Sequence, residues 1–226
     1  MKAIILAAGE GQRMRPLTLT VPKSLLKIKG RPVLDYVFDA LPPEIDEVIV
    51  VVRHLGEQIK NYLGENYRGR KIAFVEGSDK GTAYSFLATK PVIGKEEFLV
   101  LYGDEFPNPE DVCNCLAAGL SVITFESNNP KLHGMASLRP DGTLEAVVEK
   151  PEIFESRTAV GGLMVLNDAI FKYQPYPNQK REYYLTSLLN QFVKEHRVVC
   201  IPSKNFIGDI TAPQDLDRVE NLIDRN

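Results

Sequence analysis

The sequence predicts an α/β protein with a mixed, mostly parallel central sheet flanked by helices. Short runs rich in valine and isoleucine have the composition of parallel strands buried on both faces, at residues 3–7, 48–52, 72–75 and 98–102. Amphipathic stretches typical of helices separate these runs, at residues 32–41, 55–63 and 82–88. Strands that alternate with helices favour a parallel sheet with right-handed crossovers.

The second half of the chain predicts an antiparallel addition to this sheet. The strong turn formers RPDG, at residues 139–142, join predicted strands at residues 134–138 and 144–148. Further strands are expected at residues 121–125, 160–166 and 198–201, and helices near 182–195 and 212–223. Thr211 is expected to cap the last helix, with Pro213 in its first turn. Because no linker-like stretch interrupts the chain, we expect one domain over residues 1–226.

Charge and apolar patterning argue against polyanionic partners and membranes. The chain of 226 residues has a net charge of −3 and no basic run, which disfavours nucleic acid and anionic lipid as partners. The apolar run that begins at Ala3 is broken by Gly9 and Glu10, so it is too short for a signal segment or a membrane span. The three cysteines have no zinc-like spacing and are expected to be reduced. These features predict a cytoplasmic protein.

A glycine-rich segment, LAAGEGQRM at residues 6–14, follows the first predicted strand. Such a turn binds anions, because free backbone N–H groups converge there and glycine permits close approach. The dinucleotide fingerprint does not fit, because Met14 stands at its third glycine position, and no G-x-x-x-x-G-K-[ST] occurs for a P-loop. The segment is therefore a different phosphate-binding loop, one that carries its own arginine at Arg13.

This loop, the Pro-Leu-Thr that follows it and Pro22-Lys23 resemble the signature of the sugar-1-phosphate nucleotidyltransferases, which include glucose-1-phosphate thymidylyltransferases. Further matches extend the resemblance over essentially all 226 residues. It implies a Rossmann-like single domain of the nucleotide-diphospho-sugar transferase type. It also implies the reaction of an NTP with a sugar-1-phosphate to give an NDP-sugar and pyrophosphate. Because the chain ends soon after the last predicted helix, we expect no C-terminal β-helix domain.

The resemblance assigns cations and carboxylates to the phosphoryl transfer. Negative charge builds up as pyrophosphate leaves, and fixed cations, metal ions and backbone N–H groups lower the barrier to that step. Arg13 and Lys23 are implied to hold the triphosphate. Asp104, at the carboxyl end of a predicted strand, and Asp209 are implied Mg²⁺ ligands. Glu105 is expected to face away from Asp104 on an extended chain.

The segment EGSDKGTA, at residues 76–83, resembles the nucleobase segment of this family and implies that Glu76 contacts the base. A carboxylate only accepts hydrogen bonds, and guanine offers donors at N1 and N2, so Glu76 favours GTP, with dTTP, UTP and CTP as other candidates. The other nucleotide-binding residues that the resemblance implies are Leu6, Ala7, Ala8, Gly9, Gly11, Gly81 and Thr82.

Later motifs resemble the acceptor site of the family. PKLHG, ending at Gly134, resembles P-x-x-Y-G and implies close approach of a sugar hydroxyl to the backbone. Glu149 and Lys150, in a match to E-K-P, are implied to accept bonds from sugar hydroxyls and to hold the acceptor phosphate. Glu182 lies in a match to E-x-x-[LI]-T and is a further acceptor-binding candidate, although Ser187 stands where Asp is common.

Val160 and Gly162 occupy the place of the family's sugar-binding strand, and Val160 matches the thymidylyltransferase variant. That match conflicts with the guanine preference that Glu76 indicates, so the base stays open. Two other readings also stay open: a cytidylyltransferase that uses inositol phosphate or phosphocholine, and a non-catalytic nucleotide-sugar-binding regulator. A homo-oligomer is compatible with the sequence. The attacking phosphate oxygen is already anionic, so no general base is expected.

Overall fold

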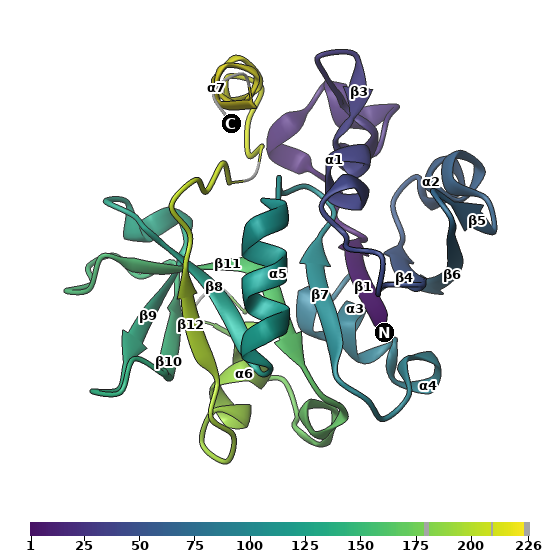
Figure 1. The fold of residues 1–226 in the computed structure, drawn as a ribbon. Coiled ribbons are helices and arrows are strands. Elements are labelled where there is room, and N and C mark those ends of the chain that lie inside the picture. Colours follow the sequence, from purple (N-terminus) through teal and green to yellow (C-terminus); the bar gives the residue numbers. More distant parts are fainter. Residues whose placement is uncertain (179–180, 209, 224–226) are drawn as a thin grey trace.

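The computed structural model describes residues 1–178, 181–208 and 210–223, and parallel strands form its centre. These strands are β7 (Phe98–Tyr102), β1 (Lys2–Ala7), β4 (Glu47–Val52) and β6 (Arg70–Glu76), adjacent in that order (Figure 1). Their pairing is parallel and in continuous register, with Ala7 opposite Val52 at the carboxyl edge. The four apolar runs that predicted a parallel sheet are confirmed, and three of them extend by one to three residues.

The remaining strands add the antiparallel half of the sheet. β11 (Thr158–Leu166) runs antiparallel to β7 and links it to β9 (Gly134–Leu138), β10 (Leu144–Glu149) and β8 (Ser121–Glu126). β12 (Val199–Pro202) pairs with β8, and β5 (Asn66–Tyr67) pairs with β6 at the opposite end. The register of β11 against β8 shifts between Val160 and Met164. That irregularity lies where the sheet borders the site described below. A separate ribbon pairs β2 (Lys27–Ile28) with β3 (Arg31–Pro32).

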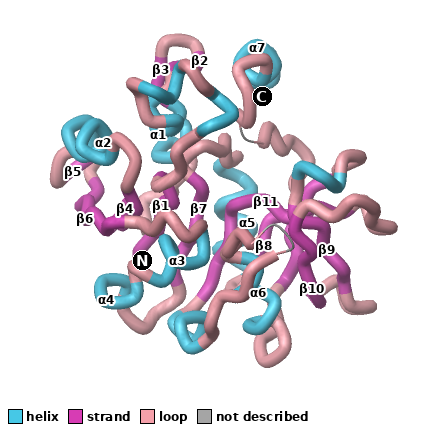
Figure 2. The backbone as a smooth tube through the Cα atoms, turned by 180° about the vertical axis from the view of Figure 1, so that it is seen from behind, coloured by secondary structure: helices cyan, strands magenta, loops and turns pink. Residues whose placement is uncertain are grey.

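Helices cover both faces of the sheet (Figures 1 and 2). One apolar cluster packs α1 (Val33–Asp39), α2 (Gly56–Leu63) and α5 (Pro109–Ala118) on one face. The other cluster packs α3 (Thr82–Leu87), α4 (Lys90–Ile93) and α6 (Thr186–Phe192) on the opposite face. Strands buried on both sides account for their uniformly apolar composition. Among the described residues, no helix is long and apolar enough to cross a membrane.

The last helix begins later than the sequence indicates. α7 spans Asp215–Ile223, and the Asp215 carboxylate accepts hydrogen bonds from the backbone N–H groups of Thr211 at 2.7 Å and Ala212 at 2.8 Å. The expectation that Thr211 caps this helix is wrong, because Thr211 lies four residues before the first residue of α7, in the turn that the Asp215 carboxylate holds. α7 also contributes Val219 to a third apolar cluster with Met14, so the C-terminal helix packs against the N-terminal loops.

Candidate active site

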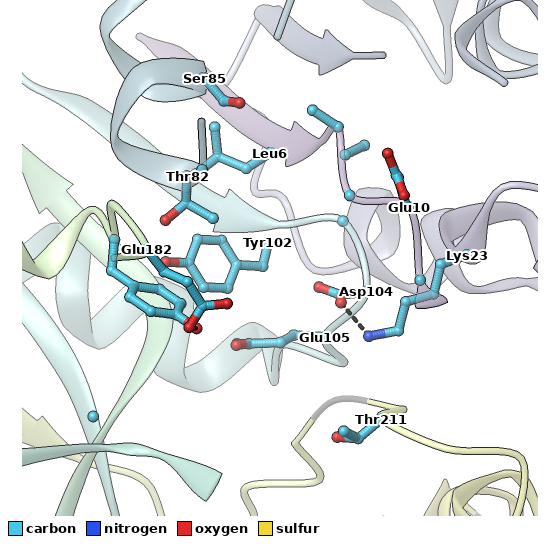
Figure 3. Close-up of a pocket in the computed structure, with 18 of the residues that line it drawn as sticks. Leu6, Glu10, Lys23, Thr82, Ser85, Tyr102, Asp104, Glu105, Glu182 and Thr211 are labelled. Atoms are coloured by element: carbon cyan, nitrogen blue, oxygen red, sulfur yellow. Dashed lines mark hydrogen bonds and ion pairs between the residues drawn. The ribbon is translucent and has the colours of Figure 1, made fainter. Parts of the chain in front are cut away.

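A cavity of about 550 Å³ opens at the carboxyl edge of the parallel strands (Figure 3). Its walls come from the loop after β1, the ends of β4 and β7, the start of α3, and the β9, β10 and β11 region. Ligands of open α/β sheets bind at this edge, where strand ends leave backbone groups unpaired. The cavity is therefore where the site residues expected from the sequence should gather.

The glycine loop forms one wall of the cavity. Gly11 has a φ of 60°, in the left-handed region, and a Cβ there would lie 2.9 Å from the Cγ2 atom of Thr18. The Thr18 hydroxyl donates a hydrogen bond to the Gly11 carbonyl oxygen at 2.7 Å. A short 3₁₀ turn, Gln12–Met14, then buries Met14 in the third apolar cluster and leaves Arg13 exposed at the cavity. Glycine is required at residue 11 because both its φ and its close packing exclude a side chain.

Lys23 and Asp104 meet inside the cavity. Lys23 begins a 3₁₀ turn, Lys23–Leu25, and its Nζ donates a hydrogen bond to the Oδ2 atom of Asp104, just beyond β7 (Figure 3). The two side chains are 13% and 30% exposed, so the ion pair is partly shielded from solvent. A carboxylate can bind a metal ion, and a fixed cation beside it can bind an anionic ligand of that metal ion.

Glu10 has a partner that the sequence did not reveal. Its Oε1 atom accepts a hydrogen bond at 2.8 Å from Nη2 of Arg53, the first residue after β4. Its Oε2 atom accepts another at 2.9 Å from Nε2 of Gln12. These hydrogen bonds, the one from Gln12 most, lower the pKa of Glu10 to about 2. Glu10 therefore ties the glycine loop to the end of β4.

The region around α3 brings small residues into the cavity. Gly81 has a φ of 120°, and a Cβ there would lie 2.5 Å from the carbonyl oxygen of Tyr183. Thr82 lines the cavity, and its Oγ1 atom accepts a hydrogen bond from the backbone N–H of Leu185 at 3.0 Å. Glu76, in contrast, is exposed and does not line the cavity. It lies near Lys60 of α2, whose pKa is raised chiefly by a hydrogen bond to Glu57 and to a smaller extent by the charge of Glu76. Alternation along β6 turns Glu76 to the face that α2 covers.

The acceptor motifs form the opposite wall of the cavity. Lys150 donates a hydrogen bond from Nζ to the Tyr184 hydroxyl at 2.9 Å, and that hydroxyl donates to Oε2 of Glu182 at 2.9 Å. The Thr186 hydroxyl donates to Oε1 of Glu149 at 2.8 Å. Burial raises the pKa of the Glu149 carboxyl above its usual value, and burial likewise raises the pKa of Tyr184. This wall therefore offers a cation among hydrogen-bonded carboxylates.

Glu105 was expected to face away from Asp104, but it lines the same cavity. Its Oε2 atom accepts a hydrogen bond from the backbone N–H of Gly162 at 2.9 Å, because the chain turns after Gly103 and does not continue as a strand. A Cβ on Gly162 would lie 2.6 Å from the Tyr102 ring and 2.7 Å from Oε1 of Glu105. Strand alternation was the wrong assumption here, and the sequence holds no other signal for this contact.

Most of the residues expected at the site come together. The cavity is lined by Leu6, Ala7, Ala8, Gly9, Gly11, Arg13, Lys23, Gly81, Thr82, Asp104, Gly134, Glu149, Lys150, Val160 and Glu182. Glu76 and Gly162 do not line it, although Gly161 does. Asp209 lies outside the described residues. Residues that line the cavity without having been expected there include Glu10, Arg53, Tyr102, Glu105 and Tyr184.

Comparisons with known proteins agree with this geometry. The chain is 32% identical over 231 residues to a bifunctional sugar-1-phosphate nucleotidylyltransferase/acetyltransferase of Sulfurisphaera tokodaii, covering 100% of this chain and 55% of that protein. It therefore spans about half the length of that curated relative. It is 28% identical to the UTP–glucose-1-phosphate uridylyltransferase AglF of Haloferax volcanii, covering 99% of this chain and 96% of that protein.

The fold also matches solved structures. A Bacillus anthracis protein, described as a glucose-1-phosphate thymidylyltransferase in complex with a sucrose, superposes with a TM-score of 0.84 at 22% identity, over 98% of this chain and 94% of its own. That likeness confirms the predicted mixed, Rossmann-like fold. The family model described as Nucleotidyl transferase matches residues 2–224. The chain belongs to the nucleotidyl transferase family, which the motifs from the glycine loop to the E-K-P segment had indicated.

Proposed function

We propose that the protein transfers a nucleotidyl group from an NTP to a sugar-1-phosphate, giving an NDP-sugar and pyrophosphate. One observation carries this proposal: the Lys23–Asp104 pair and the Lys150–Tyr184–Glu182 chain open into one cavity. A triphosphate bound at Lys23 and Asp104 and an acceptor phosphate bound at Lys150 would place two anions close together in this cavity. Flanking cations are what make such an approach feasible.

In the proposed reaction an oxygen of the acceptor phosphate attacks the α-phosphorus. The bond from that phosphorus to the bridging oxygen of the β-phosphate breaks, and pyrophosphate leaves. Lys23, Arg13 and the backbone N–H groups of the glycine loop would neutralise the charge that moves onto the leaving group. Lys150, held by the Tyr184 hydroxyl, would orient the attacking phosphate. No proton has to be removed from the nucleophile, so no residue needs to act as a general base.

The residues present fit Mg²⁺ as a cofactor. Asp104 offers a half-buried carboxylate at the cavity, and Mg²⁺ uses one or two protein carboxylates together with substrate phosphates. No group of three or more His, Cys, Asp or Glu side chains within the described part of the chain could hold a metal without substrate. Bound Mg²⁺ would supply charge neutralisation for the triphosphate. Asp104 would hold the metal ion, and the Lys23 amine beside it would contact phosphate oxygens.

A sugar is the acceptor that this cavity supports best. Glu149 accepts a hydrogen bond from Thr186 and packs against Gly134, where a Cβ would lie 3.2 Å from Oε1 of Glu149, and both residues line the cavity. Relatives named for sugar-1-phosphate or glucose-1-phosphate substrates support this choice. A choline headgroup would need an open aromatic face. The Tyr184 ring already has Lys150 Nζ 4.7 Å from its centroid, which disfavours phosphocholine.

A grid of five NTPs against common sugar-1-phosphates, read by pyrophosphate release with Mg²⁺, tests the proposal. Inositol phosphate and phosphocholine with CTP belong in the same grid, because turnover of either would establish the alternative acceptor. Asp104→Asn should reduce turnover at saturating Mg²⁺ by roughly a hundredfold or more. A variant within a few-fold of wild type would show that Asp104 does not hold the metal. Absence of pyrophosphate release above background throughout the grid would overturn the enzymatic function.

A further inference from the structure

Arg53 occupies a place in the cavity that none of the expected site residues fills. It follows the last residue of β4, and β4 lies between β1 and β6 at the carboxyl edge of the sheet. Its side chain is 27% exposed and lines the cavity together with Ala8 and Gly9. The strand order thus sets a guanidinium group at the part of the cavity remote from the acceptor wall.

The hydrogen bonds of Arg53 leave part of its guanidinium unsatisfied. Nη2 donates to Glu10, and this bond holds the side chain against the glycine loop. The Nε–H group is buried and has no hydrogen-bond partner among the described residues. A buried donor without a partner costs free energy, so a small shift of the guanidinium toward an acceptor in the cavity would be favourable.

The nucleobase is the part of an NTP that would reach Arg53. Asp104 lies at the end of β7 and Arg53 at the end of β4, with β1 between them, a spacing of about 10 Å between the strands. If the α-phosphate lies at Asp104 and the acceptor at Lys150, the nucleoside must occupy the end of the cavity that contains Arg53. Apart from Arg53, the paired Glu10 and Asp79, that end is lined mainly by small uncharged residues: Ala8, Gly9, Ser78, Gly81 and Ser85. Such a surface suits a flat, neutral base.

We infer that Arg53 selects nucleobases that carry a keto oxygen over those that carry an amino group at the same ring position. A guanidinium only donates hydrogen bonds. Guanine, uracil and thymine present an accepting oxygen at that position, whereas cytosine and adenine present an N–H₂ donor. Arg53 therefore stabilises bound GTP, UTP and dTTP through a hydrogen bond. With CTP and ATP, the amino group of the base and the guanidinium are both donors, so no such bond forms. The inference rests on the proposed function and refines its substrate class.

The test compares kcat/KM for the five NTPs at saturating acceptor in wild type and in Arg53→Ala. Wild type should favour the keto bases by about tenfold or more, and the variant should lose most of that ratio by losing activity with the keto bases. Arg53→Lys should retain part of the ratio, because the ammonium also only donates hydrogen bonds, although it lacks the planar fork. A wild type without keto preference would overturn the inference. So would an equal loss across all five NTPs, which indicates contact with phosphate or ribose.

Controls separate this inference from folding and from the proposed function. Arg197→Ala removes another arginine that pairs with a carboxylate, Asp141, at an exposed place outside the cavity, and should leave all five values unchanged. Thermal unfolding of each variant detects loss of the fold. Calorimetric titration with the five nucleotides needs no turnover: keto bases should bind wild type more tightly, and Arg53→Ala should reduce that difference. If pyrophosphate were never released, these affinities would still decide the role of Arg53.

Discussion

Lys23 and Asp104, 81 residues apart in the chain, form an ion pair across the cavity. The pairing brings the turn after the glycine loop to the end of β7, the strand next to β1. In the free protein each group compensates the other's charge, so neither is left desolvated alone. In the proposed reaction Lys23 would contact a phosphate and Asp104 the metal ion, so the pair marks where the triphosphate would bind.

Lys23→Ala should reduce kcat by roughly a hundredfold or more, because it removes a fixed cation from the developing charge of the leaving group. The free energy of unfolding should fall by less than about 2 kcal/mol, since the pair is partly solvated. Steady-state pyrophosphate release and urea unfolding measure the two effects. Losses of the same size in kcal/mol would assign Lys23 a structural role.

Glu105→Ala should raise the KM for the acceptor more than the KM for the NTP. The carboxylate is the partner of the Gly162 N–H, next to the register shift of β11 that sets Val160 at the cavity. Without it, a backbone donor loses its partner and the strand is less firmly held. Glu105→Gln keeps an accepting oxygen and should retain most of the acceptor affinity. Unchanged acceptor KM in both variants would contradict this positioning role.

Two glycine substitutions should separate packing from ligand binding. A Cβ on Gly162 would lie 2.6 Å from the Tyr102 ring, so Gly162→Ala should lower stability by about 1–3 kcal/mol. No heavy atom would lie within 4 Å of a Cβ on Gly9, so Gly9→Ala should leave the unfolding temperature unchanged. Because Gly9 lines the cavity, its new methyl group should raise the KM for the NTP. Thermal unfolding measures the stability of each variant, and nucleotide titration measures its affinity for the NTP. A lowered unfolding temperature of Gly9→Ala would contradict the prediction that this change affects ligand binding alone.

Acceptor binding should weaken on the acidic side of the pH profile. Burial raises the pKa of Glu149, so its carboxyl stays protonated to a higher pH than in a free glutamate. The protonated form loses acceptor capacity for sugar hydroxyls, so the acceptor KM should rise as pH falls through that raised pKa. Thr186→Val removes a hydrogen bond that favours the ionised form, and should move this rise to higher pH. An acceptor KM with the same pH dependence in both proteins would contradict this role of Glu149.

Motif spacing located most of the site, because each motif lies where a strand ends at the same edge of the sheet. Gly11 and Gly81 were expected at the site from their motifs, and the structure shows that both have a positive φ, which glycine adopts readily. The expectation for Glu105 failed because a turn replaced the extended chain, and Glu76 was placed in the cavity although strand alternation turns it to α2. A sequence motif gives the spacing of residues along the chain. Whether Glu76 and Glu105 line the cavity depends on the direction in which the folded backbone points each side chain.

The sequence by itself determined the alternating strand–helix order, the parallel core and the family, because these depend on local composition and on short motifs of fixed spacing. Tertiary structure alone decided which side chains meet: Glu10 with Arg53, Glu105 with Gly162, and Lys150 with Tyr184. Each of these contacts joins segments that are distant in the chain. Their formation depends on strand order, register and turns, which are properties of the packed sheet.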